Sequence, residues 1–158
     1  GQMGMYTRAL SYMMSHGSDG LKQATEDAVL NANYILASLS DLMTPAYSGH
    51  CMHEVLFDDT FLQNTGVDTL DFAKAMIDEG YHPMTMYFPL VVHGAMLIEP
   101  TESESKYELD RFITTMRGLA NRAKSGDIKS FKSAPQHSPT KRVDETLAAR
   151  KPVLRYEP

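Results

Sequence analysis

The feature that most constrains this chain is a stripe of apolar residues at helical spacing between positions 21 and 42. Its members are Leu21, Ala24, Ala28, Ala32, Ile35, Leu36, Leu39 and Leu42. Apolar residues that recur every three to four positions lie on one face of a helix, and that face must be covered by other elements. The stripe ends before Pro45, because proline disfavours helical backbone at the residue before it. A long amphipathic helix therefore packs against whatever the rest of the chain forms.

A shorter stripe of the same kind precedes it. It consists of Tyr6, Ala9, Leu10, Met13 and Met14, and Gly17 provides a stop. This predicts an amphipathic helix that begins almost at the first residue, with nothing before it to pack on. Because the chain also begins with glycine in place of methionine, we expect it to be a piece of a longer polypeptide.

Strands and helices alternate in the middle of the chain. The patterns predict a strand over 51–57, a helix between Asp68 and Gly80, and two short strands over 85–88 and 95–99. A long helix follows, with a buried stripe from Leu109 to Leu119. Its start matches the capping-box pattern twice, once from Thr101 and once from Ser105.

The order helix, helix, β-α-β-β-α predicts an α+β fold in which helices cover one face of a small sheet. We expect three regions. Residues 1–45 are helical, residues 46–128 form the small α+β domain, and residues 129–158 form a basic linker, a short helix around 143–150 and an extended tail. The stretch 129–142 is rich in Lys, Ser and Pro, which is typical of an exposed linker.

Charge is distributed unevenly. The net charge of −5 argues against a general nucleic-acid binder, whose affinity comes from an excess of Lys and Arg. Residues 1–128 carry 8 basic and 17 acidic side chains, whereas residues 129–158 carry 7 basic and 3 acidic ones. The basic tail either recruits an acidic partner or folds back on its own chain, and we favour the second because it needs no partner.

The sequence lacks a membrane-spanning run and a second cysteine, and these two absences bear on the partners and the cellular compartment of the protein. No apolar run approaches the roughly 20 residues needed to span a bilayer, so we expect no membrane partner. Cys51 is the only cysteine, which excludes an intrachain disulfide and favours a reducing compartment.

Candidate reactive groups cluster around residue 50. His50 and His53 stand in a His-x-x-His-Glu string, but positions three apart on a strand face opposite sides, and we predict no metal site. Cys51 and His53 would share one strand face, as a nucleophile and its base do, although a small buried cysteine is the favoured interpretation. The residues alone therefore indicate an α+β domain without a self-contained active site.

Several segments, in the same order along the chain, carry a family resemblance. They read Asp-Ala-Val-Leu-Asn-Ala-Asn-Tyr-Ile at 27–35, Cys-Met-His-Glu at 51–54, Tyr-His-Pro through Tyr-Phe-Pro-Leu at 81–90, Met-Leu-Ile-Glu-Pro-Thr-Glu-Ser-Glu at 96–104, and Arg-Lys-Pro-Val-Leu-Arg-Tyr at 150–156. Together they resemble the glycine decarboxylase family, the pyridoxal-phosphate (PLP) dependent P-protein of the glycine cleavage system. The last segment resembles the C-terminal end of the two-subunit form.

This resemblance implies the type I PLP fold, in which a large domain holds the cofactor and a small C-terminal domain closes over it. Residues 1–45 would then be the helical connector and the end of the large domain, and residues 46–128 the small domain. The family's Schiff-base lysine sits in an Asn-x-His-Lys-Thr segment that this chain lacks, and none of its eight lysines has that setting. No catalytic residue is therefore expected in this chain, and alone it should be inactive.

The resemblance also implies an activity and partners. The family is an oxidoreductase of glycine catabolism that decarboxylates glycine on PLP and passes the aminomethyl group to the lipoylated H-protein. The implied partners are the remainder of the P-protein, including subunit 1, the H-protein and glycine, in the cytoplasm if the source is bacterial. His53, Glu54, Glu99, Thr101 and Glu102 are the candidates for lining the cleft. The structural alternative is that Thr101 and Glu102 begin a helix and that His53 fills the sheet.

Two other classes of function stay open at this point. The β-α-β-β-α order also occurs in noncatalytic, ferredoxin-like domains that bind small molecules. An interaction module that dimerises through its apolar N-terminal helices is the other alternative.

Overall fold

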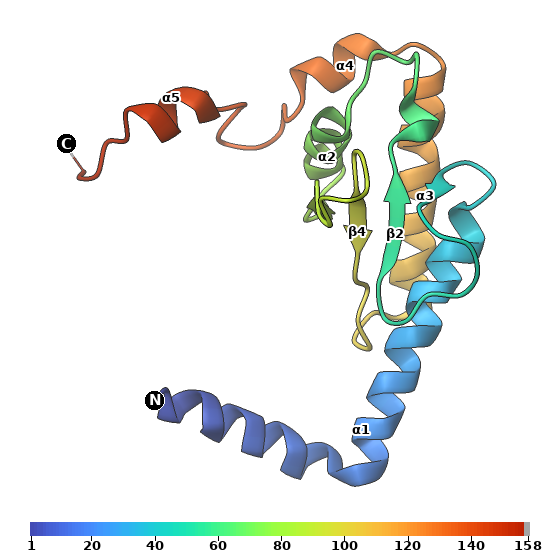
Figure 1. Cartoon of the computed structure of the whole chain (residues 1–158), viewed down its shortest axis with the longest axis vertical. Coiled ribbons are helices and arrows are strands. Elements are labelled where there is room, and N and C mark those ends of the chain that lie inside the picture. Colours follow the sequence, from blue (N-terminus) through green and yellow to red (C-terminus); the bar gives the residue numbers. More distant parts are fainter. Residues whose placement is uncertain (157–158) are drawn as a thin grey trace.

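The computed structural model describes residues 1–156 and confirms the α+β class. Two long helices run beside a small sheet, and a chain segment extends from the body at each end (Figure 1). The elements are α1 (Met3–Leu39), β1 (Thr44–Pro45), β2 (Val55–Asp58), the short 3₁₀ helix η1 (Thr60–Leu62), α2 (Thr69–Asp78), β3 (Thr85–Met86), β4 (Met96–Ile98), α3 (Lys106–Lys124), α4 (Ile128–Ser133) and α5 (Glu145–Arg150).

The sheet has four antiparallel strands in the order β1-β2-β4-β3. Val55 pairs with Ile98, and Phe57 pairs with Met96. These four side chains are buried on the face that packs against the core, whereas the alternate residue Leu97 is half-buried on the other face. The sheet therefore has one face in the core.

Strand β2 begins at Val55, so the predicted start at Cys51 is wrong. The reason is that the side-chain amide of Asn33, on α1, forms hydrogen bonds with both the N–H and the carbonyl of Cys51. Asn33 Nδ2 donates to the Cys51 carbonyl at 2.7 Å, and the Cys51 N–H donates to Asn33 Oδ1 at 3.1 Å. A side chain thus replaces the neighbouring strand at this point. Strand β1 was not predicted, and its Pro45 is tolerated because β1 lies at the sheet edge.

The two predicted N-terminal helices are both present within α1, and a sharp kink at the non-helical residue Gly17 separates them, as predicted. Gly17 has φ 63° and ψ −174°, a conformation that glycine adopts without steric cost. Before the kink, residues 3–16 leave the body of the molecule (Figure 1). After it, Ala32, Ile35 and Leu39 enter the core, and the helix ends at Leu39.

The structure contains the predicted N-caps of α2 and α3. For α3 it also decides between the two candidates, Thr101 and Ser105. Asp68 caps α2 and forms a capping box with Asp71. Ser105 caps α3, because its hydroxyl accepts a hydrogen bond from the Glu108 N–H at 3.2 Å. Thr101 is not a cap, and the expectation that Thr101 and Glu102 begin a helix is wrong, since both lie in a turn before α3.

Helices α1 and α3 are joined by polar contacts around the buried stripe of α3. Arg117 donates to both carboxylate oxygens of Asp41, at 2.6 and 2.7 Å, and to the Ser38 carbonyl at 2.9 Å. Tyr34 donates to Asp110 at 2.6 Å. These contacts fix the last turns of α1 against the body of the domain.

The expectation of an exposed linker over 129–142 is wrong for its first part. Residues 128–133 form α4, and Phe131 is fully buried, stacked on Phe72 with ring centroids 6.2 Å apart. Ala134 is buried as well. The polar composition of residues 129–142 predicted exposure, but the single aromatic residue Phe131 anchors α4 in the core. The three predicted regions all contribute to one core, and their boundaries remain a prediction.

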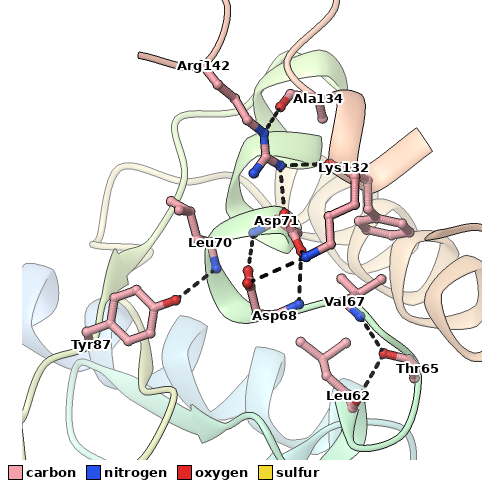
Figure 2. A network of polar contacts seen from close by, with 11 residues as sticks. Leu62, Thr65, Val67, Asp68, Leu70, Asp71, Tyr87, Lys132, Ala134 and Arg142 are labelled. Carbon is pink, nitrogen blue, oxygen red and sulfur yellow. Dashed lines mark hydrogen bonds and ion pairs between the residues drawn. The ribbon is translucent and has the colours of Figure 1, made fainter. Parts of the chain in front are cut away.

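The basic C-terminal segment folds back on α2 through Asp71, a carboxylate whose side chain is 1% exposed (Figure 2). Its Oδ2 accepts from the Asp68 N–H at 3.2 Å and from Lys132 Nζ. Its Oδ1 lies 2.8 Å from Arg142 Nη2, an ion pair without the alignment of a hydrogen bond. Arg142 also donates to the Ala134 carbonyl at 2.7 Å. The first part of the basic tail, through Lys132 and Arg142, therefore folds back on an acidic group of its own chain, as the charge distribution favoured.

Across residues 1–156, no helix combines the length and the apolar character that crossing a bilayer requires.

Candidate functional site

Three of the five predicted cleft residues come together at one end of the sheet. His53 Nε2 lies 3.7 Å from Glu54 Oε1 and 3.8 Å from Glu99 Oε1. His53 and Glu54 come just before β2, and Glu99 comes just after β4. Because Val55 and Ile98 pair in antiparallel strands, the entry to β2 lies beside the exit from β4. The sheet register therefore brings these side chains together.

An imidazole and two carboxylates within 4.8 Å of one another are groups that a metal ion could share. The side chains of His53, Glu54 and Glu99 are 54%, 39% and 53% exposed, and exposed acidic groups are common without an ion. Pairs this exposed contribute little to stability. We keep the prediction that this chain holds no metal ion.

Thr101 and Glu102 lie in a turn that is held by α1. Asn31 Nδ2 donates to the Thr101 carbonyl at 2.8 Å and to the Glu104 carbonyl at 3.2 Å. Tyr12 donates to Glu102 Oε1 at 3.0 Å. A hydrogen bond from its own backbone and then the one from Tyr12 hold the pKa of Glu102 below its usual value. The turn is thereby tied to both halves of the kinked helix.

The backbone of Thr101 is strained. Its φ is +60°, in the left-handed region that β-branched residues rarely adopt. Such a conformation costs about 1 to 3 kcal/mol and persists where the surroundings enforce it. The hydrogen bonds from Asn31 supply that constraint. Strain of this kind is typical of functional sites, which keeps Thr101 among the candidates.

A groove of about 460 Å³ opens beside the cluster. Its wall includes Tyr81 and Phe112, whose rings meet edge to face with centroids 5.5 Å apart. Glu99 is the one predicted cleft residue in the lining of this groove. Glu104 and Glu108 also line it. The structure therefore connects the sheet-end cluster to the groove through Glu99, while His53, Glu54, Thr101 and Glu102 lie outside its lining.

Sequence reasoning missed several of the residues that shape this region. Tyr81 and His82 line the groove, and Asn31 and Tyr12 hold the turn. The segments around Tyr81 and Asn31 carried the family resemblance, which was the available signal. What they contact depends on elements far away in the sequence.

The groove does not fit a PLP molecule by itself. That cofactor needs a lysine for its aldehyde and cations or backbone N–H groups for its phosphate. The lining holds three glutamates and neither Lys nor Arg, so it would repel a phosphate. Elsewhere, Lys106 is bound to Asp110, and Lys132 is bound to Asp71. The lining of this groove therefore does not complete a PLP site.

Cys51 is not set up as a nucleophile. Burial raises the pKa of its thiol, which opposes formation of the reactive thiolate. The irregular backbone at 51–54 also removes the shared strand face on which pairing with His53 rested. The small, partly buried cysteine that sequence analysis favoured is what the structure contains.

The fold and the site define a small α+β domain with a kinked N-terminal helix and a groove without Lys or Arg in its lining. Comparison with known families identifies the family of this domain. Residues 24–143 match the family model described as "Glycine dehydrogenase, C-terminal domain". The chain belongs to this family.

Relatives match the chain over its whole length. A protein of Caulobacter vibrioides named "Probable glycine dehydrogenase (decarboxylating) subunit 2" is 71% identical over 100% of this chain and 30% of its own length. Proteins of the same name from Kosmotoga olearia and Shouchella clausii are each 48% identical, over 100% and 99% of this chain and 33% and 32% of theirs. The chain thus spans about a third of the length of these relatives.

Proposed function

We propose that this chain forms part of a glycine decarboxylase that acts within the glycine cleavage system. The observation that carries the proposal is the 71% identity, across the entire chain, to a protein named as a decarboxylating glycine dehydrogenase subunit. The complete enzyme would decarboxylate glycine and transfer the remaining aminomethyl group to the lipoylated H-protein. PLP, when bound, supplies the electron sink for this chemistry.

The remaining part of the enzyme, which has no counterpart in this chain, would hold the cofactor. The absence of Lys and Arg from the groove and the presence of three glutamates there support this division. We therefore expect the isolated chain to be inactive. In the complete enzyme, residues 1–45 would be the connector, residues 46–128 the small domain and residues 129–158 its tail. The other partners would be subunit 1 of the enzyme and glycine, in the cytoplasm of a bacterium.

Glu99 is our first candidate for facing the reaction cleft. It lines the groove and lies 3.8 Å from His53, so the two groups and Glu54 can contact the same polar ligand. Thr101 and Glu102 would support the same edge from the turn held by α1. In this proposal these five residues complete one wall of the cleft, and no covalent step falls on them.

The test is a hybrid enzyme, in which this chain replaces the matching segment of the Caulobacter vibrioides protein. Glycine decarboxylation by the hybrid, supplied with PLP, subunit 1 and H-protein, should approach that of the intact relative. The relative lacking this segment should be inactive. A folded hybrid of correct assembly that releases no carbon dioxide from glycine would contradict the proposal.

A matched pair of variants tests the role of Glu99. Glu99→Gln in the hybrid should lower kcat by about tenfold or more, because a cleft carboxylate is removed, while the melting temperature stays unchanged. Glu26→Gln, which removes an exposed carboxylate paired with Lys22 on α1, should change neither. Equal activity of both variants would remove Glu99 from the candidate site.

A further inference from the structure

Two asparagines, two positions apart on α1, bind backbone groups next to the candidate site. Asn31 Nδ2 donates to the carbonyls of Thr101 and Glu104, at 2.8 and 3.2 Å. Asn33 Nδ2 donates to the Cys51 carbonyl at 2.7 Å, and Asn33 Oδ1 accepts from the Cys51 N–H at 3.1 Å. One turn of a helix therefore holds both the chain before β2 and the chain after β4.

The packing of α1 directs the two side chains to these segments. Ala32, between the asparagines, is fully buried against the body of the domain. Successive residues of a helix are rotated by about 100°, so Asn31 and Asn33 lie at opposite edges of the face that Ala32 buries. Each short amide therefore reaches the chain on its own side of the helix.

The two segments lie beyond the end of the strand ladder. Val55 and Ile98 are the last paired residues of β2 and β4 at this end of the sheet. Residues 51–54 and 99–104 continue from there without regular structure, and both lie beside α1 (Figure 1). Backbone groups that leave a ladder need other hydrogen-bond partners where water does not reach them. The two side-chain amides supply such partners.

His53 and Glu99 depend on this backbone for their relative position. Both side chains are largely exposed, so packing fixes neither, and the 3.8 Å between His53 Nε2 and Glu99 Oε1 follows from where their segments lie. Thr101, two positions after Glu99, has a strained φ of +60°. Strain of this kind relaxes when its constraint is removed. Loss of the bond from Asn31 should therefore move the turn that begins at Glu99.

The chemistry of both positions requires an amide. Asn33 Nδ2 also donates to the Val29 carbonyl at 2.8 Å, so its own helix fixes the orientation of the group. Asn31 donates to two carbonyls at once. An aspartate has the same shape but carries no N–H donor, so it would repel the carbonyls that these amides bind.

We propose that Asn31 and Asn33 are positioning residues, which set the relative position of His53 and Glu99 and act on the reaction through them. Neither asparagine belongs to the lining of the groove, so the action is indirect. This inference rests on the proposed function, since the reaction is the one proposed there.

Nuclear magnetic resonance on the isolated chain tests the geometry without reference to activity. Asn33→Ala should speed amide exchange at Cys51 by about tenfold or more, because that N–H loses its acceptor, and Asn31→Ala should leave this rate unchanged. Both variants should shift the imidazole resonances of His53. Asn121→Ala, which replaces an exposed asparagine of α3, should change neither signal. Unshifted His53 resonances in both α1 variants would overturn the proposal.

Turnover by the hybrid enzyme tests whether the asparagines act through the site. Asn31→Asp should lower kcat by about tenfold and change the KM for glycine by less than about twofold, because the turn that carries Glu99 is displaced. Combined with Glu99→Gln, it should lower kcat no further than Glu99→Gln does alone. Losses that multiply in the double variant would overturn the proposal.

A stability control comes from the C-terminal end of the same helix. Asp41→Ala removes the ion pair with Arg117 that joins this end of α1 to α3, and Asp41 contacts neither held segment. Asp41→Ala should lower the melting temperature about as much as Asn31→Asp and leave kcat unchanged. Equal losses of kcat from the two variants would show a merely structural role and overturn the proposal.

The remaining outcomes separate this proposal from the proposed function. Shifted His53 resonances with a hybrid that does not decarboxylate glycine would support the positioning role and contradict the proposed function. An active hybrid whose variants show unshifted resonances would do the reverse. Because Asn31 binds only two loop carbonyls, its variants give these results even if Asn33→Ala does not fold.

Discussion

Arg142 lies 2.8 Å from Asp71, so a guanidinium near the end of the chain meets a buried carboxylate in the first turn of α2. Lys132 contacts the other oxygen of the same carboxylate. Burial raises the pKa of Asp71, but the contacts from Lys132, from the Asp68 N–H and from Arg142 outweigh it, and the pKa lies below its usual value. One side chain thus caps a helix and anchors the C-terminal segment (Figure 2).

Replacing Asp71 should be strongly destabilising. Asp71→Ala removes half of the capping box and the buried carboxylate that Lys132 and Arg142 contact, leaving Lys132 with Asp68 at 3.7 Å, which should cost about 2 to 3 kcal/mol of unfolding free energy. Asp144→Ala is the control, because Asp144 caps the exposed helix α5 and should cost less than about 1 kcal/mol. Urea denaturation measures both values, and similar losses would contradict the anchoring role.

The same carboxylate makes stability depend on pH. A group whose pKa is depressed by folding stabilises the native state above its unfolded pKa, here an ordinary value of 3.8, and loses that contribution as the pH falls through its folded value. Acidification below about pH 4 should therefore destabilise the wild type more than Asp71→Asn. Melting curves between pH 7 and acid, taken on both proteins, test this sign; parallel curves would refute it.

Two hydroxyl residues before α3 should respond differently to substitution. Ser105→Ala removes the cap that accepts from the Glu108 N–H and should cost about 1 kcal/mol. Thr101→Gly should be neutral or stabilising, because glycine adopts a φ of +60° without strain. If Thr101 serves the site, the glycine variant of the hybrid enzyme should keep its stability and lose activity. Chemical denaturation and a decarboxylation assay separate these effects.

Two glycines should respond to alanine with opposite signs. A Cβ on Gly94 would overlap the carboxyl group of Asp59, and the φ of Gly94 is +58°, so Gly94→Ala should be destabilising by more than about 1 kcal/mol. Gly118 lies within α3 with open space around its Cβ position, and Gly118→Ala should stabilise by about 0.5 to 1 kcal/mol. Differential scanning calorimetry should show the two melting temperatures moving apart.

The parts of the fold that local sequence controls were predictable. The caps Asp68 and Ser105 act within three residues, so the start of α2 followed from pattern alone and that of α3 was narrowed to Thr101 or Ser105. The start of β2 did not, because Asn33 reaches Cys51 from a different element. Phe131 was missed for the related reason that its partner Phe72 lies on α2.

The candidate site shows the same division. Resemblance picked out His53, Glu54 and Glu99, but their proximity depends on the register of β2 against β4, which no local pattern specifies. Glu99 also reaches a groove whose wall includes Tyr81, and only the folded chain reveals that connection.

Covalent labelling with PLP tests the central claim most directly, namely that this chain completes a glycine decarboxylase without holding its cofactor. The isolated chain and the hybrid enzyme would each be mixed with PLP, reduced with borohydride and mapped by peptide mass spectrometry. The hybrid should carry one stoichiometric label on a lysine outside this chain, and the isolated chain should carry none. Stoichiometric labelling of any one of the chain's own eight lysines, in either protein, would contradict the account.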